Sequence, residues 1–405
     1  MNDTTAATEA MRFPFEQQDP LGVPPEFAML RAERPVQRVT MPYGGDGWLV
    51  TRYDDAKFVW SDRRFSRRAT VNADVPRASP KVTPPDHLMA MDPPEHSRLR
   101  RLVAGAFTVQ AAHRWRPRTE QVVEELIADL RAHGSPVDLV ENFSLPLPVT
   151  VICELLGVSK EDRHFFQHFS RVALSTTAAT LQEMLAARDE LTGYLSRNIK
   201  VRRDQPEQER SRDLLTELVN ARDNDDRLNE GELIMMGVGL LIAGHETTAN
   251  SISNFVYLLL ETGRWAHLAA HPEQVNVAVE ELLRFIQLGN SGSMTRVATE
   301  DVRVGDQLIR EGEGVIVAIN SCNRDEAVFD HADQLDLERE QNPHVRFGHG
   351  PHHCLGAQLA RMELQVALGA LLRHFPTLRF AGTAQEVPWR EGTLVHGPRE
   401  MLLSW

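Results

Sequence analysis

The sequence predicts a mainly α-helical protein with a smaller β-rich part, an α+β fold. Apolar residues recur at helical spacing over long stretches, the longest of them spanning residues 230–260. Short strand-like segments occur near the beginning of the chain and in its last third. The 405 residues are 42% hydrophobic, which is enough for a large core. We predict a loose lead-in over residues 1–25 and a single domain over residues 26–405.

The first hundred residues should begin with a β-hairpin formed by strands 36–41 and 48–53 around a glycine-rich turn. A short helix is expected over residues 54–60. The stretch 66–87 contains several prolines and is expected to form a long loop. Asp92 is then a suitable N-cap for the next helix, with prolines at its first positions.

The middle of the chain should be helical, and the last third should mix strands, loops and one helix. The predicted helices span residues 119–132, 148–156, 163–174, 181–202, 230–260 and 272–285. The predicted strands span residues 294–298, 302–304, 308–309, 315–319 and 392–396. Residues 323–346 read as irregular, and a final long helix should begin after residue 356 and end near residue 374.

The bulk composition excludes several classes of protein. The formal net charge of −13 argues against general nucleic-acid binding. The three cysteines, Cys153, Cys322 and Cys354, are too few for a disulfide framework and favour a reducing, cytoplasmic location. The longest apolar run, residues 233–244, is shorter than the ~20 residues of a membrane-spanning helix. We expect no membrane and no nucleic-acid partner.

Residues 347–356 place one cysteine in a loop rich in glycine and histidine. Cys354 lies just before a helical pattern, where free backbone N–H groups would stabilise a thiolate. Structural zinc sites use paired ligands at fixed spacing, and the sequence has no second cysteine nearby. Glycines at 348, 350 and 356 would let a flat group approach closely. With Phe347 behind it, a single thiolate on such a loop suits a haem iron.

The long central helix contains a polar interruption at residues 243–247. Glu246 and Thr247 put an acid beside an alcohol within an apolar helix, which is costly if both are buried without a purpose. Position 249 is alanine, so the histidine pair of a zinc-protease helix is missing. The interruption could be a solvent-facing polar turn. The functional alternative is a local opening of the helix where both side chains handle protons beside a ligand.

Three further groups of charged residues indicate a function only when they are considered together. Glu281 and Arg284 are three residues apart and could be a plain helical ion pair. His96 and Arg100 are four apart and share one helix face. Arg296 lies in a predicted strand.

Taken together, these motifs resemble the cytochrome P-450 family over most of the chain. Phe347, Gly350, Cys354 and Gly356 match its haem-thiolate signature, and residues 243–247 match its oxygen-activating helix. The resemblance implies a triangular, prism-like helical domain around a buried haem b. It implies catalytic roles for Glu246 and Thr247 and an iron-ligand role for Cys354. Further positions that it assigns to the cofactor or to a structural triad are Ala243, His96, Arg100, Arg296 and His352, and Glu281, Arg284 and Arg339.

The resemblance also implies partners and a substrate site. Electrons would come from NAD(P)H through a ferredoxin reductase and a ferredoxin, and the enzyme would be a monomer. The ferredoxin would dock on a basic face with the candidates Arg98, Arg101 and Arg361. Candidate pocket residues are Met89, Leu174, Val238, Gly239, Ile242, Asn290, Ser291, Ser293, Met294, Leu394 and Val395.

Residues 91–102 and 295–301 resemble the actinobacterial branch that tailors natural products. We therefore expect hydroxylation or epoxidation of a bulky secondary metabolite, such as a macrolide or other polyketide, a terpenoid or a peptide. One alternative is oxidative C–C or C–N coupling of aromatic or cyclic-dipeptide substrates. Another is a non-catalytic haem-binding sensor, which would not need the acid–alcohol pair.

Overall fold

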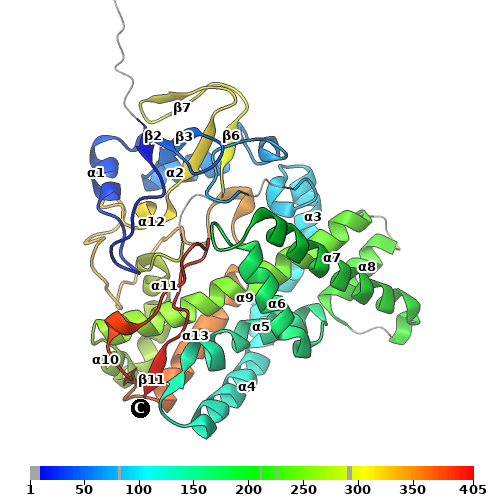
Figure 1. Cartoon of the computed structure of the whole chain (residues 1–405), viewed down its shortest axis with the longest axis vertical. Helices are drawn as coiled ribbons and strands as arrows, with labels where there is room; N and C mark the ends of the chain where they lie inside the picture. Colours follow the sequence, from blue (N-terminus) through cyan, green and yellow to red (C-terminus); the bar gives the residue numbers. More distant parts are fainter. Residues whose placement is uncertain (1–9, 81–83, 210–211, 224–226, 290–293) are drawn as a thin grey trace, which may run out of the picture.

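The computed structural model describes residues 10–80, 84–209, 212–223, 227–289 and 294–405. A helical part fills the lower and right side of the view in Figure 1, and a β-rich part lies at the upper left. The helix α9 (Glu230–Glu261) runs through the middle of the helical part, with α13 (Ala357–His374) beside it. The predicted α+β class is confirmed.

The helices before α9 are α1 (Glu26–Glu33), α2 (Tyr53–Ser61), α3 (Glu95–Ala104), α4 (Val109–His133), α5 (Pro146–Leu156), α6 (Arg163–Ala173), α7 (Leu181–Asp204) and α8 (Leu214–Asp223). Those between α9 and α13 are α10 (Trp265–Ala270), α11 (Val275–Phe285) and α12 (Ile319–Cys322). The strands are β1 (Met11–Arg12), β2 (Val36–Thr40), β3 (Asp46–Val50), β4 (Phe65–Ser66), β5 (Val137–Asp138), β6 (Arg296–Ala298), β7 (Val302–Val304), β8 (Gln307–Ile309), β9 (Gly314–Val317), β10 (Arg379–Phe380) and β11 (Leu402–Ser404).

Helix α9 begins at a capping box that the sequence analysis did not identify. The Asn229 side chain accepts the Glu232 N–H at 2.8 Å, and the Glu232 carboxylate accepts the Asn229 N–H at 2.8 Å. In its middle, a Cβ at Gly244 would lie 2.8 Å from Ile152 of α5. Glycine therefore lets α5 and α9 approach closely, and α5, α6, α7 and α13 all pack against α9.

The main sheet has the strand order β1-β2-β3-β9-β6-β4. The predicted hairpin is confirmed, because β2 pairs antiparallel with β3 from Val36 opposite Val50 to Thr40 opposite Asp46. β3 runs parallel to β9, and β6 runs antiparallel to both β9 and β4. The sheet thereby places Arg296, the first residue of β6, close to Phe65 of β4.

Several local predictions are wrong. Residues 10–25 are not loose, because β1 pairs with β2 and both Phe13 and Leu21 are 4% exposed. Asp92 does not cap α3. Its carboxylate instead accepts the Arg67 N–H at 2.8 Å and the Ser66 hydroxyl, and so caps the preceding turn. The segment 392–396 forms no strand beyond one isolated bridge at Thr393, because Gly392 has a positive φ that breaks the extended backbone.

Sequence periodicity also missed four short helices of the described ranges, α1, α8, α10 and α12. Within the described ranges, no helix is both long and apolar enough to cross a membrane. Whether residues 26–405 behave as one domain stays a prediction.

Candidate functional site

Cys354 closes a tight loop in front of α13. Its N–H donates to the Phe347 carbonyl at 2.8 Å, and α13 begins three residues later at Ala357. Gly350 has φ of +71°, and a Cβ there would lie 2.5 Å from the Trp60 carbonyl oxygen, so only glycine fits. A Cβ at Gly356 would meet no described atom within 4 Å. Cys153 and Cys322 are buried, whereas Cys354 is exposed and can offer its sulfur to a ligand.

Burial and the neighbouring polar groups shift the pKa of the Cys354 thiol in opposite directions. Desolvation by the surrounding protein raises the pKa of its thiol, although part of the side chain is accessible. The Gly356 N–H and the charges of Arg100 and Arg361 act in the opposite direction and lower that pKa. A thiol bound to a metal ion is deprotonated, so these donors and cations would favour the bound thiolate.

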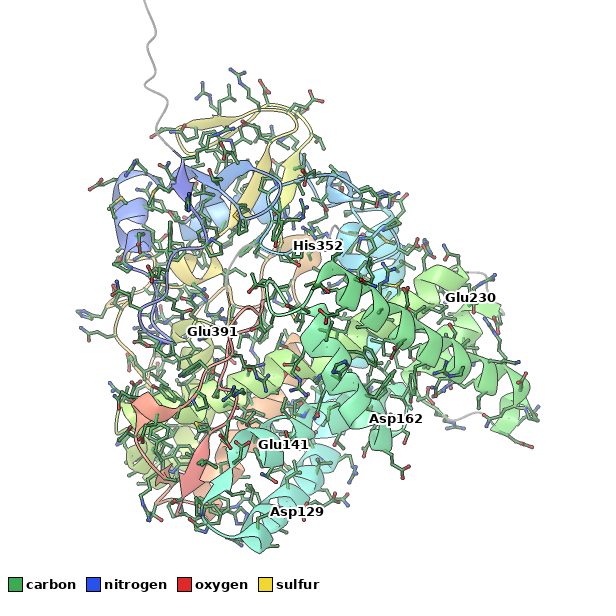
Figure 2. All side chains as sticks on the ribbon, in the orientation of Figure 1. Asp129, Glu141, Asp162, Glu230, His352 and Glu391 are labelled. Atoms are coloured by element: carbon green, nitrogen blue, oxygen red, sulfur yellow. The ribbon has the colours of Figure 1, made fainter. Side chains whose placement is uncertain are left out.

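Two buried imidazoles meet beside this loop. His96 of α3 and His352 have ring centroids 4.2 Å apart and are 1% and 8% exposed. Figure 2 shows His352 between the β-rich part and the helices around α3. All four ring nitrogens are buried and have no hydrogen-bond partner among the described residues. Such groups are costly to bury, so they indicate a polar ligand at this position.

Buried and half-buried guanidinium groups surround the two imidazoles. Arg296 is 5% exposed and donates to the Phe65 carbonyl at 3.1 Å, and Arg100 donates to the His353 carbonyl at 2.6 Å. Burial lowers the pKa of Arg296 to about 10, and burial together with Arg100 lowers the pKa of His96 to about 4. Asp92 is the acidic neighbour that favours the charged forms of Arg296 and His96. The cluster is therefore suited to an anion.

Arg67 is a further member of this cluster that the sequence analysis missed. It is 4% exposed, and burial, with Arg296 nearby, lowers its pKa to about 10. Its guanidinium donates to the Met89 carbonyl at 2.8 Å and to the Thr295 carbonyl. The position lies in the proline-rich loop, where no periodic pattern marks it, so only its burial identifies it.

These residues fit a haem. The accessible cysteine sulfur would bind the iron, and the unpartnered imidazoles and the guanidiniums would donate hydrogen bonds to two propionate carboxylates. The predicted set His96, Arg100, Arg296 and His352 is brought together, and Arg67 adds one more cation.

Helix α9 presents an accessible stripe within an otherwise buried stretch. Met235, Gly239, Ala243 and Thr247 follow one another at intervals of four residues and all retain accessible surface. Ala243 is exposed although it lies in the middle of the helix. The Thr247 hydroxyl donates to the Ala243 carbonyl at 3.0 Å. The expected local opening is wrong, because α9 is continuous from Glu230 to Glu261.

Glu246 faces a different side of α9 from Thr247. It is 3% exposed, and its carboxylate accepts the Asn250 amide at 3.2 Å. Arg390 lies 3.5 Å from the same carboxylate and comes from the C-terminal segment, on which Figure 2 labels the next residue, Glu391. Burial lowers the pKa of Arg390, and Glu246 raises it. The sequence analysis missed Arg390, which is 144 positions from its partner.

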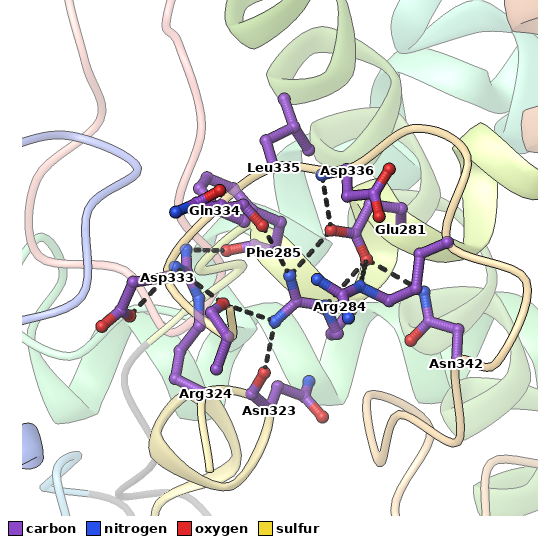
Figure 3. A network of polar contacts seen from close by, with 12 residues as sticks. Glu281, Arg284, Phe285, Asn323, Arg324, Asp333, Gln334, Leu335, Asp336 and Asn342 are labelled. Carbon is purple, nitrogen blue, oxygen red and sulfur yellow. Dashed lines mark hydrogen bonds and ion pairs between the residues drawn. The ribbon is translucent and has the colours of Figure 1, made fainter. Parts of the chain in front are cut away.

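The predicted structural triad meets in the core at Glu281 (Figure 3). Arg284 donates to both oxygens of Glu281, at 2.7 and 2.8 Å, and Arg339 donates to one of them at 3.1 Å. Arg284 also donates to the carbonyls of Asn323, Ala332 and Gln334. The triad therefore ties α11 to the irregular segment 323–342, as Figure 3 shows, and that segment leads into the cysteine loop.

Comparisons with known proteins agree with this site. The family model for cytochrome P-450 matches residues 134–264 and 271–403. The chain belongs to the cytochrome P-450 family. It is 50% identical to nocardicin C N-oxygenase of Nocardia uniformis subsp. tsuyamanensis over 98% of this chain and 99% of that one.

Two further relatives are informative. Mycinamicin IV hydroxylase/epoxidase of Micromonospora griseorubida is 43% identical over 98% of this chain and 100% of that one. The crystal structure of the LnmA cytochrome P-450 hydroxylase, from the leinamycin biosynthetic pathway of Streptomyces atroolivaceus, superposes with a TM-score of 0.89. It is 47% identical and covers 98% of this chain and 100% of that one. The protein is thus a P-450 monooxygenase that uses haem and external electrons.

Several candidate pocket residues of this P-450 lie where loops meet α9. A Cβ at Gly239 would lie 3.6 Å from the His87 ring, so the loop that carries Met89 contacts the accessible stripe. The Leu394 N–H donates to the Leu174 carbonyl at 2.8 Å, which joins the C-terminal segment to the end of α6. Ile242, Met294 and Val395 retain accessible surface.

Other pocket candidates are not supported in the same way. Val238 is 2% exposed and belongs to the main hydrophobic core, so it does not belong to the accessible stripe and does not fit the predicted pocket role. Asn290, Ser291 and Ser293 lie outside the described residues.

The basic residues proposed for ferredoxin docking fall into two groups. Arg98 pairs with Glu232 at 2.5 Å, and Arg361 pairs with Glu280 at 2.8 Å. Their charges are neutralised within the protein, so neither fits the role of a free docking cation. Arg101 is exposed on α3, and no ion pair of it is found in the described part of the chain. It remains the docking candidate.

Proposed function

We propose that this P-450 hydroxylates or epoxidises a bulky secondary metabolite. The observation that carries the proposal is the accessible stripe of α9, where apolar surface at Met235, Gly239 and Ala243 leads to the Thr247 hydroxyl. An apolar surface with one polar group suits a largely apolar ligand held close to a proton donor. By their names, the nocardicin and mycinamicin relatives oxidise secondary metabolites, which supports this class of substrate.

The chain's own residues divide the chemistry between two faces of α9. When bound, haem supplies oxygen activation with external electrons. Cys354 would offer its thiolate to the haem iron, and His96, His352, Arg67, Arg100 and Arg296 would hold the propionates. Thr247 carries an exchangeable proton on the accessible face. Asn250 and Arg390 hold Glu246 on the buried side, and we assign to Glu246 the resupply of that proton through intervening water.

Removal of the Thr247 hydroxyl is expected to uncouple electron use from product formation. In Thr247→Ala, product formed per NAD(P)H consumed should fall by about tenfold or more, because a general acid typically contributes at least that much. Substrate and haem binding should persist. Thr247→Ser keeps a hydroxyl and should retain coupling. The ratio of product to oxidised NAD(P)H measures the effect, and an unchanged ratio in Thr247→Ala would exclude the proton-delivery role.

The substrate proposal is tested by binding spectra and product mass. A panel of macrolides, terpenoids and peptides is screened for compounds that displace water from the iron and shift its absorption. Turnover of each hit with isotopically labelled O₂ should give a product that has gained one labelled oxygen atom. A product that has lost two hydrogens without gaining oxygen would assign oxidative coupling instead.

We also propose that the external electrons come from NAD(P)H through a ferredoxin reductase and a ferredoxin that docks near Arg101. Ferredoxins are acidic, and the exposed Arg101 offers a complementary charge despite the net charge of −13. Arg101→Glu should slow reduction by ferredoxin by up to about tenfold at low salt and less at high salt. Stopped-flow reduction measures this rate. An equal loss of substrate affinity would contradict a docking role.

A further inference from the structure

Glu280, the residue immediately before the structural triad's Glu281, holds the cysteine loop from outside. Its carboxylate accepts the Arg361 Nε–H at 2.8 and 3.0 Å and lies 3.0 Å from the His344 Nε2. His344 lies just before the loop, and Arg361 lies in the second turn of α13 just after it. One carboxylate on α11 therefore fastens both ends of the loop.

Further contacts connect this ion pair to Cys354, the residue expected to bind the iron. The Arg361 guanidinium lies over the Phe347 ring, 4.5 Å from its centroid, and the Phe347 carbonyl accepts the Cys354 N–H at 2.8 Å. Each contact fixes the next, so a chain of direct contacts runs from Glu280 through Arg361 and Phe347 to Cys354. Glu280 and Arg361 are 26% and 24% exposed, so solvent screens the pair only in part.

The charges of this pair also act on the cysteine. Arg361 places a positive charge near Cys354, and the Glu280 carboxylate, 2.8 Å from the Arg361 Nε, offsets that charge. Although burial acts to raise it, hydrogen bonds from His344 and Arg361 lower the pKa of Glu280, so its carboxylate is ionised at neutral pH. The His344 Nδ1 accepts the Arg346 N–H at 3.3 Å, which is consistent with a neutral imidazole that donates from Nε2 to Glu280.

We propose that Glu280 and Arg361 are positioning residues that hold Phe347 behind the cysteine ligand and set the electron affinity of the iron bound there. Groups outside the ligand set commonly orient a metal ligand and tune its redox potential. This role replaces the docking role that the sequence suggested for Arg361. The inference rests on Cys354 binding the haem iron, which a Cys354→Ser variant tests separately.

Opposite charges in the pair allow a test that separates electrostatic tuning from loosening of the loop. The one-electron ferric/ferrous potential is measured by chemical titration of the substrate-free holoenzyme, using only protein that shows the thiolate–CO absorption. Glu280→Gln removes a negative charge and should shift the potential upward. Arg361→Gln removes a positive charge and should shift it downward. Glu273→Gln, an exposed acid close to α11, is the matched control and should shift it far less.

Hydrogen exchange of the Cys354 amide provides the second measurement. It should be faster in Glu280→Gln and Arg361→Gln than in the wild type or Glu273→Gln, because the Phe347 carbonyl that accepts this N–H is less well held. Shifts of the same sign in both variants, or no shift, would overturn the tuning role. Unchanged exchange would overturn the positioning role. Slower reduction by ferredoxin in Arg361→Gln at an unchanged potential would reassign Arg361 to docking.

Discussion

Cys354→Ser is expected to abolish the red-shifted absorption of the reduced, CO-bound protein and to reduce monooxygenase activity below detection. That absorption reports a thiolate on the iron, and serine offers an alcohol that remains protonated at neutral pH and pushes far less electron density. Haem can still be retained, because the imidazoles and guanidiniums that would hold its propionates are unchanged. The measurement is the difference spectrum of the reduced protein with and without CO.

A buried cysteine, Cys153, provides the control for this variant. Cys153 is fully buried in the main core, and burial raises the pKa of its thiol to about 12. Cys153→Ser should therefore keep the red-shifted absorption, with some loss of stability. If the absorption persisted in Cys354→Ser, another residue would have to bind the iron and the site described here would be wrong.

Glu281→Gln is expected to lower the free energy of unfolding by about 3–5 kcal/mol, the range typical of breaking a buried ion pair by removing one partner. Glu281 and Arg284 are both fully buried, and the change leaves Arg284 and Arg339 without the carboxylate that they share. The segment 323–342 would also lose one of the two bonds that Glu281 accepts from the Asp336 N–H and the Asn342 amide, because glutamine keeps only one acceptor oxygen. Urea unfolding followed by circular dichroism measures the loss.

A surface acid gives the matched comparison. Glu120 is exposed and lies 3.7 Å from Arg116 within α4, so Glu120→Gln should cost well under about 1 kcal/mol. A similarly small effect of Glu281→Gln would show that the remaining carbonyl acceptors of Arg284 are sufficient to hold the segment. Loss of haem without loss of stability would instead place the role of Glu281 in the cofactor site.

Short-range patterns in the sequence predict a large part of this structure. The β2–β3 hairpin and the length of α9 follow from the alternation and the helical spacing of apolar residues, which depend on neighbours along the chain. The prediction for Asp92 is wrong because its carboxylate accepts from Ser66 and Arg67, which lie 26 and 25 positions away in the chain, and short-range patterns do not include such contacts.

By itself, the sequence determined the fold class, the cysteine that can bind iron and the acid–alcohol pair on α9. These features are carried by residue types at fixed local spacing, which the chain's chemistry prescribes before any long-range packing. Tertiary structure alone decided that Arg67 joins the anion cluster, that Arg390 holds Glu246, and that Arg361 pairs with Glu280. Each of those contacts joins residues far apart in the chain, so its geometry exists only after the helices and the sheet have packed.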